Sequence, residues 1–126
     1  MAYIQQLLKG LIDPIVLALL GQLPMYGYQI VKESEQRTAG YLKMKEGTVY
    51  PSLLRLEKKG LVDARWKRTG KRRERKYYQI TEKGRQVLAS SLTEWHDLCT
   101  AINKLTQNTD PQDKVSQRTE KTAENR

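Results

Sequence analysis

The sequence predicts a mainly α-helical protein with a small β-wing, that is, a winged helix-turn-helix domain joined to a long C-terminal dimerisation helix. An amphipathic helical segment, residues 46–60, is followed by two short strand-like segments around a glycine-centred turn. Apolar residues also recur at alternating spacings of four and three between Leu88 and Ile102, which is the heptad rhythm of a coiled-coil seam. A chain of 126 residues with 38% apolar content suffices for one core and is too short for two.

The first three predicted elements are helices. Residues 3–10 carry apolar side chains at helical spacing and end at a glycine. The second helix spans residues 14–22 and is apolar nearly all round, which places it in the core, and Asp13 is expected to cap its start. A third helix is expected over residues 25–38, because its apolar residues face inward while its charged residues face water, and Gly40 suits a left-handed end for it.

The next predicted elements form the rest of the winged domain. Residues 41–44 alternate in polarity and predict a very short strand. The helix at 46–60 is expected to bury Val49, Leu53 and Leu56. Its expected water-facing residues are Thr48, Ser52, Arg55 and Lys59. Residues 61–67 and 75–80 predict the two wing strands, with the tip at 68–74. The candidates for the buried face of the strands are Leu61, Val62, Trp66, Tyr78 and Ile80.

The last predicted helix runs from a capping Thr81 to about residue 105. The sequence therefore divides into a winged domain with its N-terminal helix at 1–80, a dimerisation helix at 81–107 and a polar tail at 108–126 that is expected to be disordered. Such a long apolar stripe favours a homodimer with twofold symmetry, since a soluble monomer would leave it exposed. The residues expected at this interface are Leu88, Leu92, Trp95, Cys99, Ile102, Ile4 and Leu7.

Positive charge is concentrated in the predicted wing. Residues 65–76 hold eight Lys or Arg residues and one Glu, and so carry +7 of the net charge of +9. A merely solvated loop is disfavoured, because like charges repel and rarely accumulate without a polyanion to meet. The expected partner is double-stranded DNA, with the helix at 46–60 in the major groove and the wing on phosphates. The candidate DNA-binding residues are Lys43, Lys45, Thr48, Tyr50, Ser52, Arg55, Arg68, Lys71, Arg72, Arg73 and Arg75.

Other classes of protein find little support in the sequence. The longest apolar run, residues 15–21, is far too short to span a bilayer and no secretory leader is evident, so no membrane partner and a cytoplasmic location are expected. His96 and Cys99 could share a metal, but no second Cys or His lies nearby in sequence, and Cys99 is better interpreted as a small apolar residue of the seam. No catalytic arrangement and no cofactor motif is found, so we expect no enzyme activity, cofactor or metal.

Five runs of residues point to one family. They are YGYQI at 26–30, GTVYP at 47–51, RLE at 55–57, KGLV at 59–62 and RKYYQITEKG at 75–84. In this order they resemble the PadR family of bacterial transcription regulators, over about residues 10–105. The single C-terminal helix resembles the short subgroup of that family, which includes multidrug-responsive members.

The resemblance implies a winged helix-turn-helix dimer that represses genes from a near-palindromic operator until a small hydrophobic or aromatic molecule releases it. It also implies that Thr48, Tyr50 and Arg55 read the major groove. In multidrug-responsive relatives a Trp of the C-terminal helix pairs with its symmetry mate around a flat hydrophobic pore, and Trp95 falls at the matching place. The chain departs from them in placing His96 and Cys99 beside this Trp. The effector-binding residues expected on this basis are Trp95, Leu8, Leu92, His96 and Cys99.

Three alternatives remain open at this point. The long apolar helix could bind the helix of a different protein, which would make the chain a protein-interaction adaptor whose wing binds nucleic acid only non-specifically. RNA binding is disfavoured, because aromatic residues at stacking positions on an open sheet are missing. Trp95 could also simply pack against Ile4, Leu7 or Leu8 of the first helix.

Overall fold

The computed structural model describes residues 2–68, 70 and 74–107, and the side chains from residue 5 onward. The expectations for the tail at 108–126, for Lys71, Arg72 and Arg73 of the wing tip, and for the Ile4 side chain therefore lie outside the described residues. The chain forms two compact units, Met1–Ser91 and Leu92–Arg126, and each is described by itself below.

The first two helices are α1 (Ala2–Lys9) and α2 (Ile12–Leu20). As predicted, α2 is a core helix: Val16, Leu17 and Leu20 are almost fully buried. The predicted start of α2 is wrong by two residues, because the N-cap position is Leu11 and no side chain caps it. Asp13 lies inside the first helical turn, where its carboxylate is used for contacts with another helix.

The next segment starts as a strand and not as a helix. Met25 and Tyr26 form β1 (Met25–Tyr26), which pairs with the second wing strand, and α3 (Gly27–Arg37) begins only after it. The left-handed end predicted at Gly40 is confirmed by its φ of +84°. The strand predicted at 41–44 is absent from the structure. This segment is instead tied to the end of α3, because the Leu42 N–H donates to Thr38 Oγ1 at 2.9 Å.

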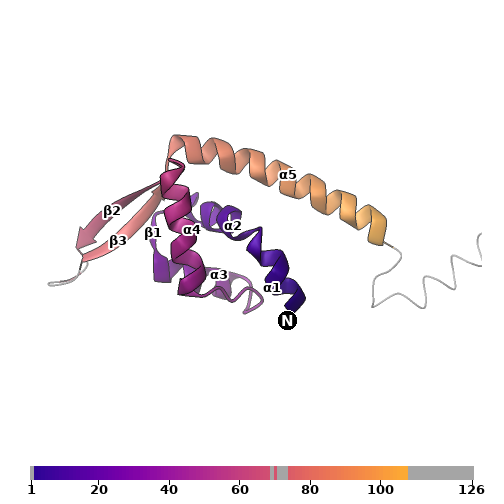
Figure 1. Cartoon of the computed structure of the whole chain (residues 1–126), viewed down its shortest axis with the longest axis horizontal. Coiled ribbons are helices and arrows are strands. Elements are labelled where there is room, and N and C mark those ends of the chain that lie inside the picture. Colours follow the sequence, from indigo (N-terminus) through magenta and orange to yellow (C-terminus); the bar gives the residue numbers. More distant parts are fainter. Residues whose placement is uncertain (1, 69, 71–73, 108–126) are drawn as a thin grey trace, which may run out of the picture. The chain divides into compact units, whose positions relative to one another are not determined.

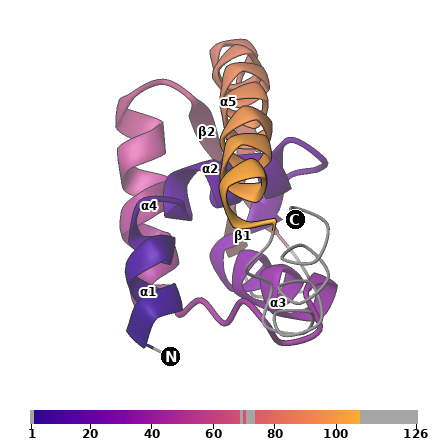
Figure 2. The ribbon, with the colours of Figure 1, turned by 90° about the vertical axis from the view of Figure 1, so that its right-hand side faces the viewer.

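The helix α4 (Glu46–Lys58) packs against both α2 and α3, and together they form a three-helix group (Figure 2). Its buried residues include Val49, Leu53 and Leu56, as predicted. The prediction that Ser52 faces water is wrong, since this residue is fully buried. Three apolar positions and one small hydroxyl therefore make up the inner face of α4.

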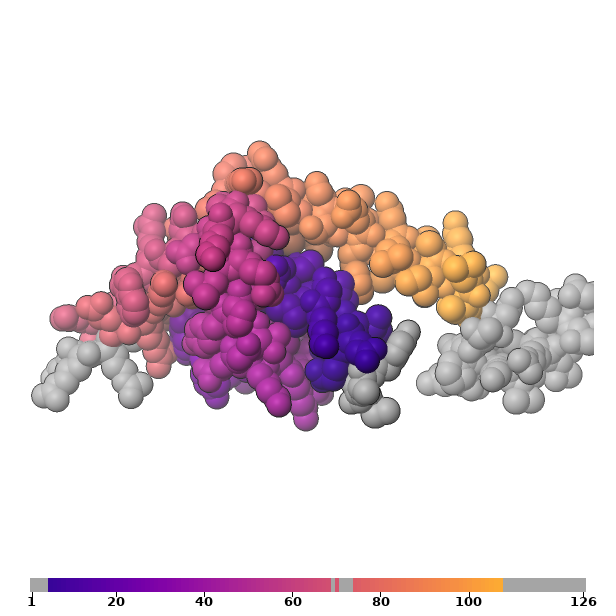
Figure 3. All heavy atoms as spheres, in the orientation of Figure 1, coloured from indigo at the N-terminus to yellow at the C-terminus, as the bar shows by residue number. Residues whose placement is uncertain are grey.

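The wing consists of β2 (Val62–Arg68) and β3 (Glu74–Ile80), and the antiparallel sheet has the order β1-β3-β2 (Figure 1). In the register Val62 lies opposite Ile80, and Trp66 lies opposite Lys76. Burial is confined to the base of the wing, where Val62 is fully covered. The prediction of a buried Trp66 is wrong, because 65% of this residue is exposed. The wing as a whole projects beyond the helices (Figure 3).

The long helix α5 (Glu82–Thr106) begins against the end of α4 and the base of the wing. The predicted N-cap is confirmed, because the Gly84 N–H donates to Thr81 Oγ1 at 3.0 Å. The same hydroxyl donates to the Gly60 carbonyl at 2.7 Å. Gly84 is buried so tightly that a Cβ there would lie 2.1 Å from the Leu61 carbonyl oxygen. The first turns of α5 are thereby fixed to the winged unit.

The second unit contains the rest of α5 from residue 92 onward. Its large apolar residues are exposed on the single chain, in keeping with the seam that the heptad spacing predicts. They are Leu92, Trp95, Leu98, Ile102 and Leu105. Leu88 differs from these, because it lies in the first unit and packs partly buried against the core of that unit. The mainly α-helical fold with a small wing and a long C-terminal helix is confirmed.

Candidate nucleic-acid interface

The outer face of α4 presents a mixed polar and apolar surface. Helical periodicity turns Val49, Ser52, Leu53 and Leu56 inward and leaves the intervening positions in water. The exposed positions are Glu46, Gly47, Thr48, Tyr50, Pro51, Leu54, Arg55 and Lys58. Thr48, Tyr50 and Arg55 therefore lie on the exposed surface, as the sequence predicts. The exposed Leu54 was missed, although its position between Pro51 and Lys58 on the same face could have indicated it.

A carboxylate of α2 holds the middle of α4. Ser52 Oγ donates to Asp13 Oδ1 at 2.6 Å. Arg55 Nε donates to Asp13 Oδ2 at 3.1 Å and Arg55 Nη2 donates to Asp13 Oδ1 at 2.8 Å. Ser52 is thus excluded from the candidate DNA contacts. Among the residues that the structure describes, Arg55 Nη1 has no hydrogen-bond partner, so this group can still meet a ligand.

These contacts shift the protonation of both charged groups. Burial of Asp13 opposes its ionisation, but the hydrogen bonds from Arg55 and Ser52 outweigh it, and the pKa of the carboxyl is lowered. The hydrogen bond to Asp13 raises the pKa of Arg55 in turn. The pair is therefore fully ionised at neutral pH, and the net positive charge that α4 offers to a polyanion is reduced by one.

A hollow of about 580 Å³ lies between α3, α4 and the wing. Its walls are largely aromatic and its only charged residues are cationic: it is lined by Tyr26, Gly27, Tyr28, Tyr50, Trp66, Arg75, Lys76 and Tyr78. Partial burial, and to a smaller extent the nearby Glu46, raises the pKa of the Tyr50 hydroxyl. This hydroxyl therefore stays protonated at neutral pH and can donate a hydrogen bond to an anion. We call this space the wing hollow.

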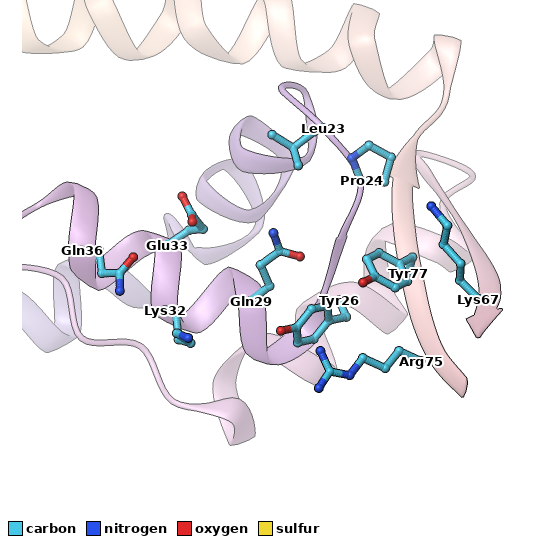
Figure 4. Close-up of a pocket in the computed structure, with 10 residues that line it drawn as sticks. All are labelled: Leu23, Pro24, Tyr26, Gln29, Lys32, Glu33, Gln36, Lys67, Arg75 and Tyr77. Atoms are coloured by element: carbon cyan, nitrogen blue, oxygen red, sulfur yellow. The ribbon is translucent and has the colours of Figure 1, made fainter. Parts of the chain in front are cut away.

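A second hollow of about 710 Å³ lies between α3 and the wing and shares Tyr26 and Arg75 with the first, and Figure 4 shows its ten lining residues. The rings of Tyr26 and Tyr77 meet edge to face, with centroids 5.4 Å apart. The Arg75 guanidinium lies 4.3 Å from the Tyr26 ring centroid and Lys67 Nζ lies 5.6 Å from that of Tyr77. The first cation–π contact joins the wing to β1, whereas the second lies within the wing and links its two strands.

The structure places the other candidate DNA-binding residues in the same unit. Lys43 and Lys45 are exposed in the segment that leads into α4, and Arg68 is exposed at the end of β2. Arg75 is partly buried by its contact with Tyr26. All four lie in Met1–Ser91 together with α4.

The residues expected to bind an effector are divided between the two units. Leu8 is buried in the core of the first unit, whereas Leu92, Trp95 and His96 are exposed in the second, and Cys99 is half-buried there. Leu7, expected at the dimer interface, is half-exposed. Within the described ranges, no three His, Cys, Asp or Glu residues are grouped so that they could hold a metal ion. No helix in the described part of the chain is long and apolar enough to cross a membrane.

Comparison with known proteins gives a consistent result. A model of the transcriptional regulator PadR-like family matches residues 16–90. A transcriptional regulator from Clostridium thermocellum shares 33% identity with a TM-score of 0.71, covering 79% of this chain and 96% of that one. A PadR family regulator from Eggerthella lenta shares 32% identity with a TM-score of 0.73, covering 86% and 92%. Bacillus subtilis PadR in complex with operator DNA shares 28% identity with a TM-score of 0.59, covering 64% and 45%.

Proposed function

Because this chain belongs to the PadR-like family of transcriptional regulators, we propose that it acts as a homodimer that binds a near-palindromic DNA operator through α4 and the wing. Members of this family are transcriptional regulators and not enzymes, and a structural relative is known with operator DNA bound. The chain is accordingly a DNA-binding transcription regulator. The dimer, the operator contacts and the response to an effector are the proposed parts.

The observation that carries the proposal is the position of the exposed face of α4 beside a basic wing in one compact unit. An α-helix fits the major groove, where Thr48 and the Nη1 of Arg55 can contact bases or phosphates. The wing brings the strongly cationic segment 65–76, which suits the adjacent phosphates. The two elements together supply both sequence reading and sequence-independent affinity.

The operator is found by sequencing genomic DNA fragments that the purified protein retains. We expect the retained fragments to share a near-palindromic site with half-sites about one or two DNA turns apart, because a twofold dimer presents two copies of α4. The Thr48→Ala variant, processed in parallel, should retain the same fragments less selectively. Fragments without a common site would overturn sequence-specific recognition.

Dimerisation is proposed through α5 from residue 92 onward. This part of the helix exposes a row of large apolar side chains with heptad spacing, and a second copy of the same helix would cover them. Trp95 lies in this row, and 47% of it is exposed on the single chain. We propose that the regulator represses its genes and that a planar hydrophobic molecule, bound between the two Trp95 side chains, releases the DNA.

A further inference from the structure

The wing hollow exposes three large aromatic side chains. Trp66 is 65% exposed, Tyr28 49% and Tyr50 42%, although they come from three different elements, β2, α3 and α4. Single exposed apolar residues are ordinary, but several around one concave surface are typical of an interaction site. We call these three residues the aromatic seat.

Cations surround the aromatic seat. Lys76 lies directly across the strand pair from Trp66, and its Nζ is 5.6 Å from the Tyr78 ring centroid. Arg75 lines the same hollow from over the Tyr26 ring. No acidic residue is among those that line it. The surface therefore suits a ligand that alternates apolar faces with negative charges.

A strand of DNA has this chemistry, because its backbone alternates deoxyribose faces with phosphates. We propose that the wing hollow binds the sugar–phosphate backbone of one strand of the duplex between the groove that receives α4 and the groove that receives the wing. This inference rests on the proposed function and names the residues that contact the backbone of one DNA strand. The rings of the aromatic seat pack against sugars, while Lys76, Arg75 and the Tyr50 hydroxyl contact phosphates.

Charge and position favour DNA over other occupants. The exposed Tyr50 of α4 and the wing residues Trp66 and Lys76 line the same hollow, so a duplex held by α4 and the wing would lie close to it. A second copy of this basic chain would bring further positive charge, and an uncharged ligand would leave the cations unused. A second copy of the chain remains an outcome of the test below.

The test measures the affinity of the full chain for a mixed-sequence duplex of about 24 base pairs over a series of salt concentrations. The Trp66→Ala variant should bind about tenfold more weakly at every salt concentration with an unchanged salt slope, because an apolar contact releases no counterions. The Lys76→Ala variant should reduce the slope by about 0.9 for each phosphate contact that is lost. The Trp66→Phe variant should retain most of the affinity, because a ring is still present.

Leu23→Ala is the matched control, because Leu23 is an exposed apolar residue that lines the second hollow and is not among the residues that line the wing hollow. This variant should bind the duplex as the wild type does. Because Trp66 is mostly exposed, its replacement should leave the thermal unfolding midpoint unchanged. A loss of affinity without a loss of fold then reports on the contact itself.

Tryptophan emission gives a second readout. The same duplex should quench the wild-type emission, and this quenching should be largely lost in Trp66→Phe, which keeps most of the binding. Equal quenching in both proteins, or an unchanged affinity of Trp66→Ala, would overturn the aromatic seat while leaving DNA binding intact. Failure of the wild type to bind any duplex at low salt would instead overturn the proposed function. A change in oligomeric mass of Trp66→Ala would identify a second copy of the chain as the occupant and also overturn the inference.

Discussion

Arg55 on α4 and Asp13 on α2 form a two-point ion pair, with Nε 3.1 Å from Oδ2 and Nη2 2.8 Å from Oδ1. The fully buried Ser52 donates to the same carboxylate at 2.6 Å. One acidic side chain of the core helix α2 therefore holds α4, the helix that we propose reads DNA, close to α2 and restrains its rotation about its own axis. It also fixes the direction of the Arg55 guanidinium.

Removing the carboxylate should destabilise the winged unit. In the Asp13→Ala variant the buried Ser52 hydroxyl loses its acceptor, so we expect the free energy of unfolding to fall by about 1–3 kcal/mol. Urea denaturation at a fixed protomer concentration measures this. Asp63→Ala is the control, because Asp63 is an exposed acid on β2 and its loss should cost little. Equal effects of the two substitutions would show that the contact with Ser52 contributes nothing.

The stability should also depend on pH through Asp13. Because the pKa of this carboxyl is lowered in the folded state, its ionised form adds stability above the unfolded pKa of about 3.9, and this stability is lost as the pH falls through the folded pKa. The difference in unfolding free energy between the wild type and Asp13→Asn should be constant near neutral pH and shrink below about pH 4. A difference that does not change between about pH 6 and pH 3 would contradict the lowered pKa.

Disrupting the apolar row of α5 should separate the proposed dimer. Leu92→Glu places an unpaired charge in the seam, and we expect light scattering coupled to size-exclusion chromatography to report the mass of one chain. Ala101→Glu puts the same charge on the opposite face of the helix and should stay dimeric. A monomeric wild type would favour the protein-interaction adaptor, in which the row binds the helix of another protein.

Planar aromatic molecules should report on Trp95. Cationic dyes are expected to quench the tryptophan emission of the wild type and to weaken its binding to the operator. In the Trp95→Ala variant the dye-dependent quenching should be much smaller, since only Trp66 remains to respond. Unchanged wild-type emission over a panel of such dyes would leave Trp95 as a packing residue and the proposed effector site without support.

Much of the fold follows from local patterns in the sequence. Helical spacing located the helices, and the Thr81 cap and the left-handed Gly40 mark two helix ends as predicted. Residues with non-local partners were misjudged: Met25 and Tyr26 form a strand only because β3 lies beside them. Ser52 is buried because Asp13 reaches it from 39 residues away in the sequence.

The candidate site shows the same division between local and non-local information. The positive charge of the wing was evident from the run of Lys and Arg residues at 65–76. The exposure of Trp66 was not, because alternation along a strand identifies its face but not how far the strand extends beyond the core. The wing hollow depends on how three elements pack together, so no single segment of the sequence could indicate it.

The central claim, that α4 reads the operator while the wing holds its phosphates, is tested most directly by salt-dependent affinities for the operator and for a scrambled duplex. Arg72 and Arg73 lie at the predicted wing tip, and replacing both by Ala should weaken binding to both duplexes similarly and reduce the salt slope by about one to two. Thr48→Ala should weaken operator binding by about 1–3 kcal/mol and leave the scrambled duplex almost unaffected. A wild-type slope in the wing variant, or equal losses on both duplexes for Thr48→Ala, would contradict this division of roles.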